Sequence, residues 1–193
     1  MAALGLRAHS GWAVIVAVAG GSAVLRRRIE MTRPGSGSKQ PYHAALELPA
    51  SEAQTVIRKL RKVVTDAAKK SVFELLNEAS ELQYEVRGAG LVVGSLVDPA
   101  TLHNEHIRAH GLEGQLFRTE LERALRKHEI SCNVLLEKTA YTTASEALRK
   151  SPAEAKRTIA SLGESREGSW RAEEKLAALA AWTALCARNR KTS

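Results

Sequence analysis

The apolar and polar positions near the start of the chain predict a β-hairpin. Residues 12–25 are mostly apolar and rich in Val and Ile, which favour strands. Gly20 and Gly21 interrupt this run, and after them apolar and polar residues alternate with period two as far as Met31. Two strands joined by a Gly-Gly turn make a hairpin. We expect this hairpin to form the middle of a sheet.

The same apolar run is also compatible with a secretory signal peptide or a membrane anchor, because Arg7 precedes it. However, the two glycines break the run, whereas a membrane helix needs about 20 continuous apolar residues. The strand interpretation is therefore favoured, and it predicts no membrane segment.

Helical and strand-like patterns alternate along the rest of the chain. Ser51 and Gln54 have the form of a capping box, and Ser151, Pro152 and Glu154 form a second helix start. The predicted elements are a flexible loop at 33–40, a short third strand or irregular stretch at 41–45, a helix from 51 to about 79, a strand at 84–94, a helix at 99–127 in one piece or two, a strand at 130–136, and helices at 143–150, 152–162 and 170–188.

This order of elements predicts an α/β fold: a mixed sheet that begins with hairpin strands and has helices packed on both faces. Right-handed crossovers leave few topologies for such an order, and one of them is the ribonuclease-H-like fold. We expect one domain over residues 1–188, followed by a basic tail at 189–193.

Positive charge is concentrated in the first third of the chain. The 193 residues carry a formal net charge of +8, and residues 1–72 hold 12 of the 29 Lys and Arg but only 4 of the 21 Asp and Glu. Such a surface attracts phosphate, although a solvated basic face or an acidic protein partner would explain it equally well. The residues that we expect to contact nucleic acid, by charge or by stacking, are Arg26, Arg27, Arg28, Arg58, Lys62, Tyr42 and His43.

The two cysteines and the absence of cofactor motifs limit the compartment and the cofactors that the sequence is compatible with. Cys132 and Cys186 form neither a disulfide framework nor a zinc-binding pattern, which favours a cytoplasmic protein with both residues in the core. The sequence contains no phosphate-binding P-loop and no dinucleotide fingerprint, so we expect no organic cofactor.

Residues 3–16, ALGLRAHSGWAVIV, resemble the opening of RuvC-like Holliday-junction resolvases. In that family a strand with a catalytic Asp leads into a turn like Ser10-Gly11-Trp12 and then into a second apolar strand. A bacterial group of such domains is also similar around His106, His110, Glu113 and residues 116–118. The resemblance implies a ribonuclease-H-like fold over residues 3–188, and a nuclease that uses divalent Mg²⁺ or Mn²⁺.

The sequence departs from the family at the first catalytic position. The expected Asp falls within residues 4–7, which read Leu-Gly-Leu-Arg, and no acid precedes Glu30. A cation such as Arg7 repels a metal ion, whereas Mg²⁺ requires hard oxygen ligands. The fold and the metal site are therefore separate predictions.

A row of histidines is the strongest local candidate for chemistry. His103, His106, His110 and Glu113 follow one another at helical spacing, which would place all four on one face. Such a face could bind Zn²⁺, Mn²⁺ or phosphate, or could transfer protons, although it could also be a His-rich surface with no ligand. The predicted metal ligands are Glu113, His106, His110 and Glu174.

The predicted catalytic residues are Glu113, Glu173, His9 and His110. The resemblance implies that acids of the last helix, here Glu173 and Glu174, belong to the active centre, although acids in a first helical turn also stabilise the helix dipole. The resemblance also implies that His9 lies near the active centre of this fold. Glu137, after a predicted strand, is either a functional side chain or a surface charge.

Two functions remain open at this point. The first is resolvase-like nucleic-acid processing by a metal-dependent phosphodiesterase that acts on DNA or RNA. The second is a non-catalytic module that keeps the fold, has lost the metal site, and binds nucleic acid or another protein. A homodimer is compatible with either function.

Overall fold

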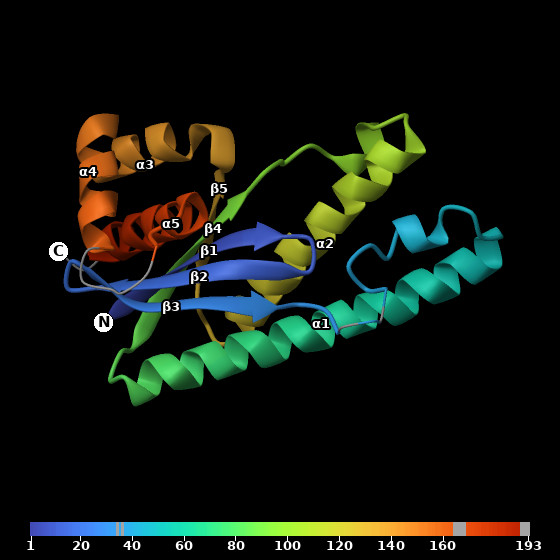
Figure 1. Ribbon diagram of the computed structural model, residues 1–193, viewed down its shortest axis with the longest axis horizontal. Helices are drawn as coiled ribbons and strands as arrows, with labels where there is room; N and C mark the ends of the chain where they lie inside the picture. Colours follow the sequence, from blue (N-terminus) through green and yellow to red (C-terminus); the bar gives the residue numbers. More distant parts are fainter. Residues whose placement is uncertain (34, 36, 164–168, 190–193) are drawn as a thin grey trace.

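The strands form one mixed sheet in the order β3-β2-β1-β4-β5 (Figure 1). The computed structural model describes residues 1–33, 35, 37–163 and 169–189. β1 pairs antiparallel with β2 and parallel with β4, β2 pairs antiparallel with β3, and β4 pairs parallel with β5. The strands are β1 (Ala2–His9), β2 (Trp12–Ala19), β3 (Ser22–Glu30), β4 (Val86–Val93) and β5 (Cys132–Leu136).

Helices cover both faces of the sheet, as the sequence predicts. Residues of α1 and α2 pack on one face, and residues of α3, α4 and α5 pack on the other (Figure 1). The helices are α1 (Ala50–Glu81), α2 (Glu105–Lys127), α3 (Ala140–Leu148), α4 (Pro152–Leu162) and α5 (Ala172–Asn189), with short 3-10 helices η1 (His43–Ala45), η2 (Pro99–Thr101) and η3 (Glu137–Thr139).

Two features of the sheet differ from what the sequence pattern predicts: the position of the hairpin and the candidate third strand at 41–45. The hairpin β2–β3 lies at one edge of the sheet, and the central strand is β1, which the resemblance implies but the alternation does not reveal. Arg7 and His9 mask the apolar character of β1, although its other residues through Leu6 are fully or almost fully buried. The stretch at 41–45, one candidate for a third strand, forms η1 instead.

Capping side chains explain where two helices begin, α4 and α2, whereas α1 begins without one. Ser151 and Glu154 form the predicted capping box of α4. The predicted box at Ser51 is wrong, because α1 begins one residue earlier and Pro49 at its N-cap offers no side-chain acceptor. Asn104 accepts a hydrogen bond from the Ile107 N–H, so α2 begins at residue 105 and continues unbroken through its glycines.

The apolar run that resembled a signal peptide is the second strand of the sheet. Within the described residues, no helix combines the length and the apolar character needed to cross a bilayer. The predicted loop at 33–40 contains turns and bends where it is described, and residues 190–193 of the predicted tail lie outside the described part.

Helix α5 approaches the sheet closely because glycines face it. A Cβ atom on Gly5 of β1 would overlap the carbonyl oxygen of Ala177, and one on Gly90 of β4 would lie 2.5 Å from that of Ala180. The facing helix surface is built from alanines, which are fully buried. This close contact fixes the start of α5 against the carboxyl end of β1.

We expect the substitution Gly5→Ala to lower the free energy of unfolding by at least about 1–3 kcal/mol, because a methyl group has no space and α5 must move. Gly114→Ala is the matched control. No atom lies within 4 Å of a Cβ at that position of α2, so the variant should gain about 0.5–1 kcal/mol. Urea unfolding of both variants measures the difference, and equal stabilities would contradict the close-packing argument.

Candidate functional site

The carboxyl end of β1 carries a buried cation. Arg7 is 9 % exposed and faces α5, on the same side of the strand as Gly5. Its Nη2 forms an ion pair with the Glu137 carboxylate, and its Nη1 donates a hydrogen bond to the Ala8 carbonyl at 2.6 Å. Glu137 directly follows β5, so this pair connects the central strand to the edge strand.

A second polar contact joins β1 to α5. The Nε2 of His9 lies 2.8 Å from Oε1 of Glu173, in the first turn of the helix. The His9 ring stacks on Trp12 with 4.0 Å between ring centroids, and the Arg28 guanidinium lies 4.1 Å from the Trp12 ring. Burial and the charge of Arg7 lower the pKa of His9 below its usual value of 6.5, against the opposing effect of Glu173.

These residues do not fit the carboxylate cluster that a two-metal nuclease requires. Arg7, a cation, lies within the stretch 4–7 where the first-strand Asp is expected from the sequence, and the nearby acids Glu137 and Glu173 contact Arg7 and His9. Glu174 accepts a hydrogen bond from the Arg171 N–H at 2.9 Å, which is the role of an acid at a helix start. The electrostatics at this rim therefore disfavour Mg²⁺.

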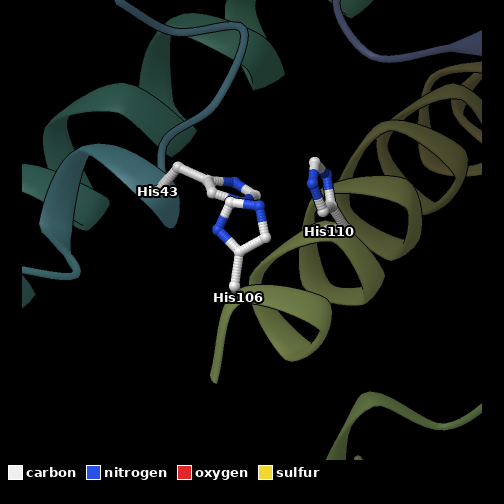
Figure 2. Close-up of side chains that lie close together, drawn as sticks. All are labelled: His43, His106 and His110. Carbon is white, nitrogen blue, oxygen red and sulfur yellow. The ribbon is translucent and has the colours of Figure 1, made fainter. Parts of the chain in front are cut away.

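A group of histidines lies at the start of α2. His106 and His110, one turn apart on α2, meet His43 of η1, and Figure 2 shows the three rings facing one another. Their ring centroids are 4.1–4.8 Å apart. His103 is not part of the group, because it precedes the Asn104 cap and lies outside the helix.

A buried carboxylate supports this group from below. Glu113 is fully buried, and its Oε1 lies 2.9 Å from His43 Nδ1 and 3.2 Å from the His43 backbone nitrogen. Its Oε2 lies 3.9 Å from His110 Nδ1, and no residue in the described part of the chain forms a hydrogen bond with it. Among the described residues, the group whose ligand atoms lie close enough together to hold a metal ion consists of the three histidines, and it includes neither Glu113 nor Glu174 of the predicted set.

The structure thus divides the predicted catalytic residues between two places. His9 and Glu173 lie at the rim of β1, whereas His110 and Glu113 lie on α2. A cleft of about 490 Å³ connects the two places, because residues of both line it. The residues that line the cleft and can carry positive charge are Arg7, His9, His110 and Arg118.

Most of the predicted nucleic-acid contacts have acidic or structural partners. Arg27 pairs with Glu78 at 2.6 Å, Arg28 with Glu30 at 2.7 Å, and Lys62 with Asp66 at 3.0 Å. Arg26 donates a hydrogen bond to the carbonyl of Ser169, and Tyr42 packs against the core. His43 belongs to the histidine group. Every residue predicted to contact nucleic acid therefore has such a partner or role, except Arg58.

Sequence reasoning did not assign His43 to the metal-binding set, and it did not single out Arg118 as a cleft residue. No local spacing connects His43 with Glu113, which is 70 residues away. Cys132 behaves as a core residue, as predicted, since burial raises the pKa of its thiol to about 12.

Comparison with known proteins identifies the fold. No protein-family model and no curated protein matches the sequence. The solved structures that match include two that are aligned over 100 % of this chain, both with a TM-score of 0.57. One is Thermus thermophilus RuvC, at 12 % identity over 98 % of its chain. The other is T. thermophilus RuvC in complex with a Holliday junction substrate, at 11 % identity over 97 % of its chain. The chain has a RuvC-like fold. The resemblance of residues 3–16 is therefore confirmed at the level of the fold, and β1 of this RuvC-like sheet carries Arg7 at its carboxyl end.

The lowered pKa of His9 predicts a pH-dependent stability. Between the folded-state pKa and 6.5, the unfolded chain binds more protons, so stability decreases as the pH falls through this window. We expect Tm to fall less steeply below pH 6.5 for His9→Gln than for the wild type. His128→Gln, which changes an exposed histidine, should keep the wild-type slope. Equal slopes for His9→Gln and the wild type would contradict this assignment.

The ion pairs at the rim predict the effect of restoring an acid. Arg7→Asp places a third carboxylate near Glu137 and Glu173, and the mutual repulsion should lower Tm in the absence of divalent ions. Added Mg²⁺ should raise Tm for this variant but not for the wild type or for Arg7→Gln. Thermal melts with and without Mg²⁺ test this, and a Mg²⁺ response in the wild type would contradict it.

Proposed function

We propose that this protein binds nucleic acid in the cleft between the β1 rim and α2, and that it does not cleave the bound strand at the rim. The observation that carries the proposal is Arg7, a buried cation in the place where a resolvase holds a metal-binding acid. The same substitution that removes a metal ligand adds a positive charge next to the cleft. Phosphate is the ligand that such a change favours.

The walls of the cleft support this function. Arg118 comes from the middle of α2, and Arg7 and His9 come from the opposite wall. Gly94 and Gly114 also line the cleft, and neither has an atom within 4 Å of the position of a Cβ. A sugar-phosphate backbone could therefore approach the main chain closely at both positions. One of the structures with this fold is a RuvC bound to a Holliday junction, which makes branched DNA the first ligand to test.

A metal-dependent phosphodiesterase is the second candidate function, and the histidine group favours it. His110 lines the cleft, so a hydrolytic centre on α2 could reach a phosphate bound there. This reaction would depend on His106, His110 and Glu113 and would leave the ion pairs of the rim unused.

Nucleic-acid binding can be tested with fluorescently labelled four-way junction, duplex and single-stranded DNA and with RNA. We expect the affinity to fall steeply with salt, with a log–log slope of about −0.9 for each phosphate neutralised on duplex DNA. Arg118→Ala should weaken binding and reduce the slope by about one contact. Arg126→Ala removes an exposed arginine of the same helix outside the cleft, and it should bind like the wild type. Affinity that is independent of salt, or equal losses in the two variants, would overturn the proposal.

Incubation of the same substrates with Mg²⁺, Mn²⁺ or Zn²⁺ distinguishes binding from cleavage. We expect no cleavage that depends on Glu173, because its carboxylate is paired with His9. Cleavage that is abolished by Glu173→Gln would show that the β1 rim is catalytically active, and it would refute the proposal. Cleavage that survives Glu173→Gln but is lost in Glu113→Gln would establish the second candidate.

A further inference from the structure

We propose that His43, His106 and His110 bind one transition-metal ion of the Zn²⁺ class through three ring nitrogens, and that Glu113 holds His43 in the orientation required for this. The proposal concerns a different part of the molecule from the β1 rim, and it does not depend on nucleic-acid binding.

The three histidines converge from two segments that are far apart in the sequence. His106 and His110 lie on the same face of α2, and η1 brings His43 against them (Figure 2). One nitrogen from each ring can be chosen so that all three lie within 4.8 Å of one another. Zn–N bonds of about 2.0–2.1 Å place tetrahedral ligands about 3.3 Å apart, so the rings need to close by an ångström or two. His106 and His110 are exposed, so rotation of their side chains can provide this movement.

The hydrogen bond to Glu113 sets the protonation form of His43. Its Nδ1 lies 2.9 Å from Glu113 Oε1, and a carboxylate can only accept, so Nδ1 carries the proton. The lone pair is then on Nε2, the form that binds a metal. This Nε2 atom is buried and has no hydrogen-bond partner among the described residues, which is costly for a ring nitrogen unless a ligand occupies the site. Metal-binding histidines usually donate their other ring nitrogen to a carboxylate in this way.

The burial of Glu113 is a second, independent observation. A fully buried carboxylate requires a compensating positive charge, since desolvation of an unpaired charge is expensive. In the described part of the chain its ion-pair contacts are with His43 and His110, which carry charge only when protonated. A divalent ion on the histidines would supply the missing charge at neutral pH.

The ligand set determines the class of metal. Three imidazole nitrogens suit Zn²⁺, Co²⁺, Ni²⁺ and Cu²⁺, whereas Mg²⁺ prefers oxygen ligands in an octahedron. Three protein ligands also leave a coordination position for water or an anion, as in catalytic zinc sites. Because His110 lines the cleft, that position would lie next to it.

Metal titration of the tag-free full chain, stripped with a chelator, tests the proposal. We expect one Co²⁺ or Zn²⁺ per chain by calorimetry, and visible absorption bands typical of Co²⁺ bound to nitrogen. Excess Mg²⁺ should not compete, because Mg²⁺ prefers oxygen ligands. No binding by the wild type, or binding in which Mg²⁺ competes, would overturn the assignment.

Variants assign the ligands. Glu113→Gln should weaken binding about 10- to 100-fold, which is the usual effect of losing a partner that orients a ligand. His106→Ala, on an exposed side chain, should weaken binding still more while keeping the wild-type Tm without metal. His103→Ala removes a neighbouring exposed histidine outside the group and should bind metal like the wild type. Equal affinities for His106→Ala and His103→Ala would refute the site, whatever the result of the nucleic-acid titrations.

Discussion

The close contact between α5 and the sheet is the constraint on which the arrangement of the rim depends. Gly5 and Gly90 allow the alanine surface of α5 to lie directly on β1 and β4. At this distance the first turn of the helix reaches the end of β1, where Glu173 can pair with His9. A larger residue on either strand would separate the helix from the sheet and break this pair. The chemistry of the rim is therefore a consequence of backbone packing two turns of helix away.

At the β1 rim, acidic side chains can be balanced either by bound metal ions or by basic side chains of the protein. An acid at the end of the first strand would add to the negative charge of the neighbouring acids. Metal ions can balance this charge. Here the first strand carries Arg7, which balances the charge of Glu137 through an ion pair within the protein, while Glu173 contacts His9. The positive charge that remains near the cleft comes from fixed side chains, so it requires no bound ion.

Local patterns in the sequence predicted the fold better than the site. The hairpin, the long helices and the capping box at Ser151 depend on neighbouring residues, so periodicity and composition reveal them. The central strand was less visible, because Arg7 and His9 interrupt its apolar pattern. The site depends on contacts between distant residues: Arg7 and Glu137 are 130 positions apart, and Glu113 is 70 from His43. Nothing in the local sequence specifies such pairs, so only the three-dimensional arrangement could reveal them.

Helix α2 belongs to both candidate sites. Its first turns carry His106 and His110, its middle carries Arg118, and Glu113 between them is fastened to η1. A helix moves along its axis as a nearly rigid body, so any displacement of its first turns by a metal ion on the histidines would also shift the wall that Arg118 presents to the cleft. Metal binding at the start of α2 and nucleic-acid binding in the cleft beside its middle would then be thermodynamically linked. Each ligand would change the affinity for the other by the same factor.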